Sequence, residues 1–197
     1  MGEFGVDLML RLSRAIDAVN LRIGKSVAWL IVAAVLVSAI NAVLRKTLNI
    51  SSNAWLELQW ILFSMVFLWC AAWTLLANEH IRIDIVNNMF PKRVRHWIDV
   101  LGHAFFLLPF TVVMLITGWP FFFASFRINE QSGNAGGLPQ WPAKVLIPTG
   151  FFLLFLQGIS ELIKRIAVMQ GRIPDPHAVH HPLEEAIEQL VEVIEKR

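Results

Sequence analysis

Four apolar stretches dominate the pattern of hydrophobic and polar positions along the chain. They lie at about residues 27–44, 54–77, 98–121 and 145–163, and shorter polar segments separate them. Each stretch is close to the roughly 20 residues that an α-helix needs to cross the hydrocarbon core of a bilayer. Backbone polar groups in that core must be hydrogen-bonded within the segment, which favours helices over open strands. The pattern therefore predicts an all-α integral membrane protein with four transmembrane helices in two hairpins.

The first 26 residues precede this membrane domain, which we place at residues 27–168. Apolar positions such as Leu8, Leu12 and Val19 recur there at helical spacing between basic residues. This pattern predicts an amphipathic leader helix at the membrane interface. A cleaved secretory signal is the alternative, but the basic leader is long and the apolar run continues beyond it, which favours an uncleaved anchor.

The C-terminal end divides into a hinge at residues 169–182 and a cytoplasmic amphipathic helix at residues 183–197. Proline and histidine are frequent in the hinge, and the last segment is acidic with apolar residues along one stripe. Three histidines of the hinge have no acidic partner at helical spacing, so we assign no metal site there.

The segment at residues 78–91, NEHIRIDIVNNMFP, forms a polar waist between the two hairpins. Its apolar positions fit both a strand and a helix, so periodicity alone leaves both open. An N-terminal asparagine and a C-terminal proline favour a short amphipathic helix along the membrane surface. A loop touching the headgroups is the alternative. The interfacial side chains of this waist are Glu79, His80, Arg82 and Asp84.

Composition agrees with a membrane protein. Of the 197 residues 56% are hydrophobic and only 16% are charged, with a mean hydropathy of +0.57, whereas soluble domains carry about 25% charged residues. The net charge is only +2, and the basic residues form no single patch, which argues against nucleic acid as a partner. The leader, the connection between the second and third spans and the segment after the fourth span hold 13 of the 17 basic residues. Both termini are therefore predicted to be cytoplasmic.

Charged residues near the span ends suggest two ion pairs. Glu57 lies near the outer end of the second span, and Arg45 ends the first span at a similar depth. We predict a structural Arg45–Glu57 pair, with separate snorkelling to the headgroups as the alternative. Glu161 and Lys164, three residues apart near the inner end of the fourth span, suggest a local helix pair.

Histidines raise the question of haem, which helices can hold between two imidazoles. Only His103 lies clearly within a span, and no second histidine faces it at equal depth. The sequence contains no P-loop, no HExxH motif and no nucleophile elbow. We therefore predict no catalytic residues, no cofactor and no metal. The alternative function, membrane anchor of a redox enzyme, rests on His80, His96 and His103 alone.

Aromatic side chains surround the second and third spans. Four helices cannot bury all of them against each other, so some must face lipid or another subunit. The aromatic positions concerned are Phe63, Phe67, Trp69, Phe105, Phe106 and Phe110.

Three stretches resemble the small membrane subunit of TRAP (tripartite ATP-independent periplasmic) transporters, the DctQ-like family. They are SSNAWLELQW from Ser51, NEHIRIDIV from Asn78, and GLPQWPAKVLIPTGFFLLFLQGISELIKRI from Gly137. The resemblance covers about residues 26–176 and implies a multi-pass protein of the bacterial inner membrane. It further implies ion-gradient-driven uptake of organic acids, with a periplasmic solute-binding protein and a large membrane subunit that this chain would brace without binding substrate.

The resemblance also gives two surfaces an expected partner. The aromatic positions of the second and third spans would contact the large subunit, and membrane lipids would cover the rest. The connection between the third and fourth spans, FRINEQSGNAGGLPQW from Phe126, is the longest one on the outer side. It would form a docking loop for the binding protein through Arg127, Glu130, Asn134 and Trp141.

Overall fold

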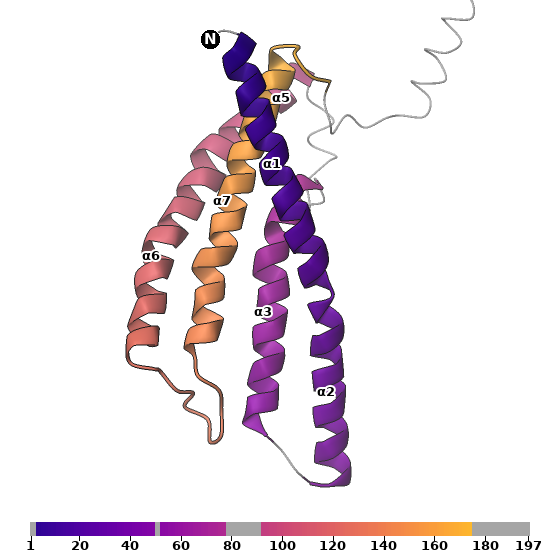
Figure 1. Cartoon of the computed structure of the whole chain (residues 1–197), viewed down its shortest axis with the longest axis vertical. Coiled ribbons are helices and arrows are strands. Elements are labelled where there is room, and N and C mark those ends of the chain that lie inside the picture. The colour runs from indigo at the N-terminus through magenta and orange to yellow at the C-terminus, as the bar shows by residue number, and fades with distance from the viewer. Residues whose placement is uncertain (1–2, 50–51, 78–91, 175–197) are drawn as a thin grey trace, which may run out of the picture.

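The computed structural model describes residues 3–49, 52–77 and 92–174 (Figure 1). The polar waist, with Glu79, His80, Arg82 and Asp84, and the C-terminal helix lie outside the described residues. Within these ranges the structure is all-helical apart from an isolated antiparallel bridge between Gln131 and Pro139. The elements are α1 (Glu3–Ala28), α2 (Leu30–Thr47), α3 (Asn53–Leu76), α5 (Lys92–Leu101), the π-helix η1 (Gly102–Leu107), α6 (Leu108–Arg127) and α7 (Trp141–Met169).

The predicted fold class is confirmed. Four helical segments are long and apolar enough to cross a membrane, at Gly5–Thr47, Asn53–Leu76, His96–Arg127 and Trp141–Met169. Consecutive segments run in opposite directions, so the N-terminus lies at the same end of the bundle as the end of α7, and the loop after α6 lies at the other end (Figure 1).

The predicted leader is helical: it corresponds to α1, which continues almost directly into the first span. Helices α1 and α2 follow one another with only a turn at Trp29 between them, and the combined Gly5–Thr47 segment of 43 residues is about 65 Å long at 1.5 Å per residue. Instead of standing apart from the bundle, α1 packs lengthwise against α3 and α7 (Figure 1). The reason lies in its polar side chains, which form hydrogen bonds to α7.

A seven-residue repeat directs this packing. Ser13, Asn20, Val27, Ala34 and Asn41 are each 8% exposed or less. Residues seven apart stay on one side of a helix that winds around its neighbours in a left-handed sense. All five side chains are polar or modest in size, which lets the long helix lie close to α3 and α7.

Helix α7 is the centre of the bundle and contacts α1, α3 and α6. Glycines allow two of the closest approaches. A Cβ at Gly150 would lie 2.8 Å from Leu68 Cβ and 3.0 Å from the Leu68 carbonyl oxygen in α3, and a Cβ at Gly24 in α1 would lie 2.6 Å from Trp73 Cβ. Small residues at such crossings let helices pack tightly in a bilayer, where apolar burial alone does not drive association.

The third span contains a π-helical turn whose position has a local cause. Pro109 has no backbone N–H, and its ring crowds the carbonyl four residues earlier. The regular α-helical hydrogen bonds between residues four apart are therefore interrupted just before Pro109. The N–H of Leu108 bonds instead to the carbonyl of His103. His103 is 8% exposed, and its Nδ1 lies 2.6 Å from the carbonyl oxygen of Asp99.

Polar and small residues occupy most of the interior of this bundle. Among the described residues the largest fully buried side chains include Gln157, Asn20 and Thr111, whereas many large apolar side chains are exposed. Lipid chains are as apolar as leucine, so a membrane protein can leave such side chains on its outside.

Candidate functional site

A cluster of polar side chains joins α1 to α7, and we call it the polar seam. It consists of Ser13, Asp17 and Asn20 of α1 and Gln157, Ser160, Glu161 and Lys164 of α7. Gln157 is completely buried at its centre. Its Nε2 donates to Asp17 Oδ1 at 2.8 Å and to Glu161 Oε1 at 3.0 Å, while its Oε1 accepts from Asn20 Nδ2 at 2.8 Å.

The remaining contacts of the seam involve hydroxyl and charged groups. Ser160 Oγ donates to Asp17 Oδ1 at 2.6 Å and lies 2.7 Å from Ser13 Oγ. Lys164 Nζ donates to Asp17 Oδ2 at 3.0 Å and to Glu161 Oε1 at 2.5 Å. The predicted Glu161–Lys164 pair is therefore confirmed, but it is part of a larger network that also binds the leader.

The seam continues to α5, because Arg165 Nη2 lies 3.4 Å from Asp99 Oδ2. Sequence reasoning missed Asp17, Asn20 and Gln157 because it searched the apolar spans for isolated charges. The heptad repeat of small and polar residues was the signal that could have found this face of α1.

At the other end of the bundle, the connection between α6 and α7 folds over Glu57; we call residues 126–141 the outer loop, after the side of the membrane predicted for them. This carboxylate is 7% exposed; its Oε1 accepts from Ser132 Oγ and, at 2.9 Å, from Asn134 Nδ2, and its Oε2 accepts from the backbone N–H of Leu138 at 2.6 Å. Asn53 Nδ2 adds a hydrogen bond to the Ala135 carbonyl at 3.0 Å. The loop is thus held to the N-terminal end of α3.

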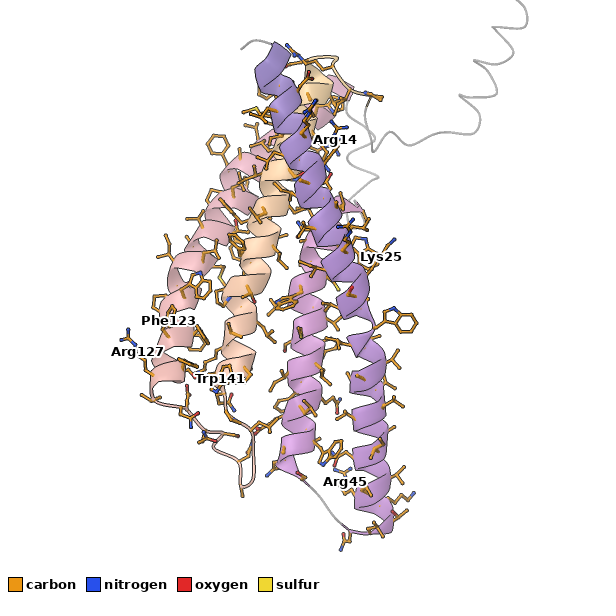
Figure 2. All side chains as sticks on the ribbon, viewed as in Figure 1. Arg14, Lys25, Arg45, Phe123, Arg127 and Trp141 are labelled. Carbon is orange, nitrogen blue, oxygen red and sulfur yellow. The ribbon has the colours of Figure 1, made fainter. Side chains whose placement is uncertain are left out.

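These contacts correct the predicted Arg45–Glu57 pair. Arg45 lies on the exposed end of α2 (Figure 2), and its guanidinium is not a partner of Glu57. The physical reason is that the loop supplies three donors to both carboxylate oxygens, including a backbone N–H that is fixed in place. The prediction considered only the hairpin of the first two spans and not a loop that returns from farther along the chain.

The four predicted docking residues divide into structural and exposed ones. Asn134 and Trp141 hold the loop, the latter by edge-to-face packing on Phe126 with ring centroids 5.5 Å apart. Glu130 forms an ion pair with Lys144 at the start of α7. Arg127 is exposed at the end of α6 (Figure 2).

The Glu130–Lys144 pair predicts a pH dependence. The hydrogen bond from the Lys144 ammonium lowers the pKa of Glu130 below its ordinary value of 4.5. A carboxylate with a lowered pKa in the folded state stabilises the protein above its unfolded pKa, and this contribution is lost as the pH falls through the folded value. We expect Glu130→Gln to lower the melting temperature at pH 7, and we expect this difference to shrink steadily as the pH falls below 4.5. Melting curves of both proteins in detergent at several pH values measure this, and an equal difference at every pH would contradict it.

Five of the six predicted aromatic interface residues are on the outside. Phe63, Phe67, Phe105, Phe106 and Phe110 are between 53% and 77% exposed.

Trp69 differs from them, since its indole Nε1 donates to Thr149 Oγ1 of α7 at 3.0 Å. Its N–H needs an acceptor in an apolar environment, and α7 supplies one. Trp69 therefore joins two helices of this chain.

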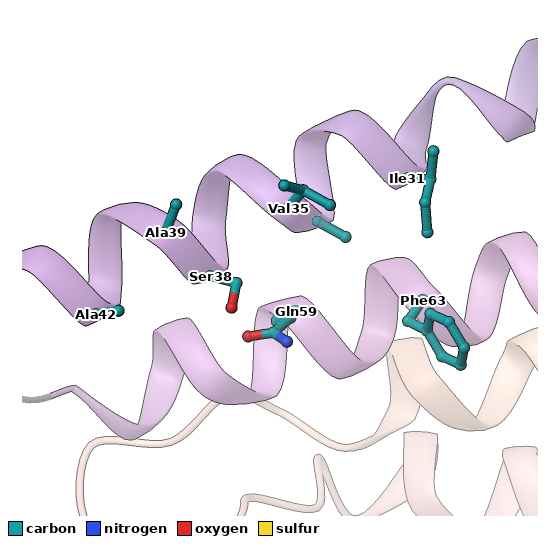
Figure 3. A pocket seen from close by; sticks show the side chains of 8 residues that line it. Ile31, Val35, Ser38, Ala39, Ala42, Gln59 and Phe63 are labelled. Atoms are coloured by element: carbon teal, nitrogen blue, oxygen red, sulfur yellow. The ribbon is translucent and has the colours of Figure 1, made fainter.

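A groove lies between α2 and α3, in the half of the hairpin that includes the N-terminal end of α3. It has a volume of about 370 Å³ and is lined mainly by small or apolar side chains of α2 and by Phe63 of α3. The side chains of Ser38 and Gln59 point into it (Figure 3).

The described residues contain no group of three or more His, Cys, Asp or Glu side chains arranged to hold a metal ion. His103 is buried against its own helix through Asp99, and Nδ1 of His96 is buried without a hydrogen-bond partner.

These features define a four-span helical membrane protein whose buried polar groups join its own helices and whose aromatic groups face outward. Residues 34–168, about two-thirds of the chain, match the family model described as tripartite ATP-independent periplasmic transporters, DctQ component. The chain belongs to this family of TRAP transporter small permease subunits. A search of curated proteins found no match.

Proposed function

We propose that this chain is the non-catalytic scaffold subunit of its transporter. In this proposal it braces the large membrane subunit while that subunit performs ion-gradient-driven, binding-protein-dependent uptake of organic acids across the bacterial inner membrane. The observation that supports it most is the contrast between the residues inside the helix bundle and those on its surface. Inside the bundle, the helices are joined by tight packing and by interhelical hydrogen bonds. On its surface, large aromatic side chains cover α3, η1 and α6.

The arrangement of the exposed aromatic residues supports a lateral partner in the membrane. Phe63 and Phe67 share one side of α3, since residues four apart lie above one another on a helix. Phe106 and Phe110 do the same across η1 and α6. Large, rigid aromatic side chains provide contact area at a low cost in conformational entropy, which suits an interface with the large subunit.

The outer loop is the proposed docking surface for the binding protein. Its shape is fixed by Glu57 and by the Glu130–Lys144 pair, so a partner would meet a preorganised surface. Arg127 and Ile128 are exposed near its start, the latter 72% exposed.

Uptake measurements test the proposal. Proteoliposomes containing the large subunit with and without this chain are titrated with binding protein and a radiolabelled organic acid. We expect uptake only when this chain is present. We expect Arg127→Glu to reduce uptake at limiting binding protein, more strongly at low salt, because exposed charges act on the rate of encounter.

Lys46→Glu is the matched control, since it reverses an exposed charge at the same end of the bundle but outside the loop. Full uptake without this chain would refute the scaffold role, and equal titration curves for the Arg127 and Lys46 variants would refute docking at the loop.

The proposed orientation, with both termini cytoplasmic, predicts the accessibility of two engineered thiols. After replacement of Cys70, the single native cysteine, a cysteine is introduced at Gly133 in the outer loop or at Gly5 in α1; a Cβ at either position meets no atom within 4 Å. We expect a membrane-impermeant maleimide to label Gly133→Cys in intact spheroplasts and Gly5→Cys only after permeabilisation. The opposite pattern would reverse the orientation.

A further inference from the structure

The polar seam fixes the rotation of α1 about its own axis. Ser13, Asp17 and Asn20 all face α7, and Gly24 meets Trp73 of α3. These four positions lie on one side of the helix over about three turns. The residues on the opposite side of α1 must therefore point away from the bundle.

That opposite side, which we call the outward face of α1, is both apolar and basic. Leu8, Leu12 and Val19 are between 50% and 61% exposed. Four basic residues lie beside them, and all are exposed: Arg11, Arg14, Arg22 and Lys25 (Arg14 and Lys25 are labelled in Figure 2).

The outward face of α1 has a net positive charge. In the described part of the chain, none of its basic side chains forms an ion pair; Arg14 Nε bonds only to the Leu10 carbonyl of its own helix, at 3.3 Å. Asp17 is turned inward and paired with Lys164, so it does not offset them. Asp7 is exposed four residues before Arg11, so it offsets one of the four basic charges.

The depth of this face along the bundle follows from its neighbours. At the level of the seam α7 changes from apolar to charged, at Glu161 and Arg165, and α3 ends at Leu76 shortly beyond the contact with Gly24. This change marks the boundary between hydrocarbon and headgroups. The four basic residues extend about 21 Å along the helix axis, at 1.5 Å per residue. Long basic side chains can bend toward the headgroups from either side of the boundary, so all four can reach them.

We propose that the outward face of α1 binds anionic phospholipid headgroups of the leaflet around it. A basic stripe beside an apolar stripe at the bilayer boundary fits phosphates and acyl chains together, and each basic residue there adds attraction to an anionic surface. The polar seam contributes to lipid binding, because it holds α1 lengthwise against α7 and so keeps the basic residues of α1 facing outward. The inference is independent of the partners proposed above, since it concerns only this chain and lipid.

Native mass spectrometry of the purified full-length chain tests the proposal. The protein in detergent is mixed with phosphatidylglycerol or with phosphatidylcholine of the same acyl chains, and retained lipid is counted. We expect preferential retention of phosphatidylglycerol. Two double variants, Arg11→Gln with Arg14→Gln and Arg22→Gln with Lys25→Gln, should each weaken this preference, by about fivefold per charge removed.

The control is Arg45→Gln with Lys46→Gln, which removes two exposed basic residues at the other end of the bundle and should leave the preference unchanged. Circular dichroism and gel filtration check that each variant is folded. Equal retention of the two lipids, or an equal loss in the control and in both α1 variants, would overturn the proposal. So would full competition by glycerol phosphate, because this would show a site for a free phosphate ester and not for a lipid surface.

Discussion

Replacement of Gly150 by leucine is expected to separate α3 from α7 and to destabilise the bundle by more than about 3 kcal/mol. Even the first added atom would lie 3.0 Å from the Leu68 carbonyl oxygen and 3.1 Å from its carbonyl carbon. These are backbone atoms within a helix, so they cannot rotate away as the end of a side chain could. Gly150→Ala should show a smaller loss, since the strain of roughly 1–3 kcal/mol is partly offset by the better helix propensity of alanine, about 1 kcal/mol.

Gly118→Ala is the matched control for this prediction. The added Cβ there would lie 3.4 Å from Pro148 Cβ, which is close to an ordinary van der Waals contact. We expect this variant to be as stable as the wild type or slightly more stable. The free energy of unfolding is measured by circular dichroism during titration of detergent micelles with sodium dodecyl sulfate. Equal values for Gly150→Ala and Gly118→Ala would show that the α3–α7 contact is not close-packed.

The four spans were predictable because length and hydrophobicity determine them. The second span, expected at about residues 54–77, is α3 at Asn53–Leu76, and the fourth, expected at about 145–163, lies within α7. A bilayer imposes one thickness on every span, so composition alone locates such helices without knowledge of their packing. The helices extend beyond the predicted ends because charged and polar residues can continue a helix outside the hydrocarbon.

The contacts between spans were harder to predict. Glu57 was recognised as a charge near the end of its span and was paired with Arg45. Its donors instead come from Ser132, Asn134 and Leu138, more than 70 residues later. A spacing rule relates residues within one helix or hairpin and carries no information about such long-range pairs. The Glu161–Lys164 pair could be predicted because it obeys a local rule.

The packing of α1 against the bundle was not predicted, for a different reason. Its apolar stripe was recognised, and the expectation was that this stripe would set the orientation of the helix at the interface. In the structure the polar residues Ser13, Asp17 and Asn20 set it. Apolar side chains gain little from facing other helices rather than lipid, whereas polar groups at that depth need partners, and α7 offers them.

Replacement of Gln157 by leucine therefore is expected to release α1 from α7. The leucine would fill a similar volume, but the Asn20 amide would lose its nearer acceptor, and Asp17 and Glu161 would each lose a donor. Asn20 and Glu161 are buried, whereas the Asp17 side chain is 21% exposed. An unsatisfied buried polar group costs about 1–3 kcal/mol. Interhelical hydrogen bonds in membrane proteins average only about 0.6 kcal/mol, because the unfolded state also finds partners. With three groups affected, we expect a loss of about 2–3 kcal/mol.

Gln59→Leu provides the matched control, since it makes the same chemical change at a glutamine that faces the groove between α2 and α3 (Figure 3). That amide lies among apolar side chains and forms no hydrogen bond to another described residue, so its removal should leave the bundle as stable or make it more stable. Release of α1 is detected separately from global unfolding by hydrogen exchange, as faster exchange of the α1 amides at Ser13–Asn20 than of those in α3. If Gln157→Leu and Gln59→Leu exchange alike throughout α1, the seam does not hold the leader. Packing at Gly24 against Trp73 would then be the contact that attaches α1 to the membrane domain.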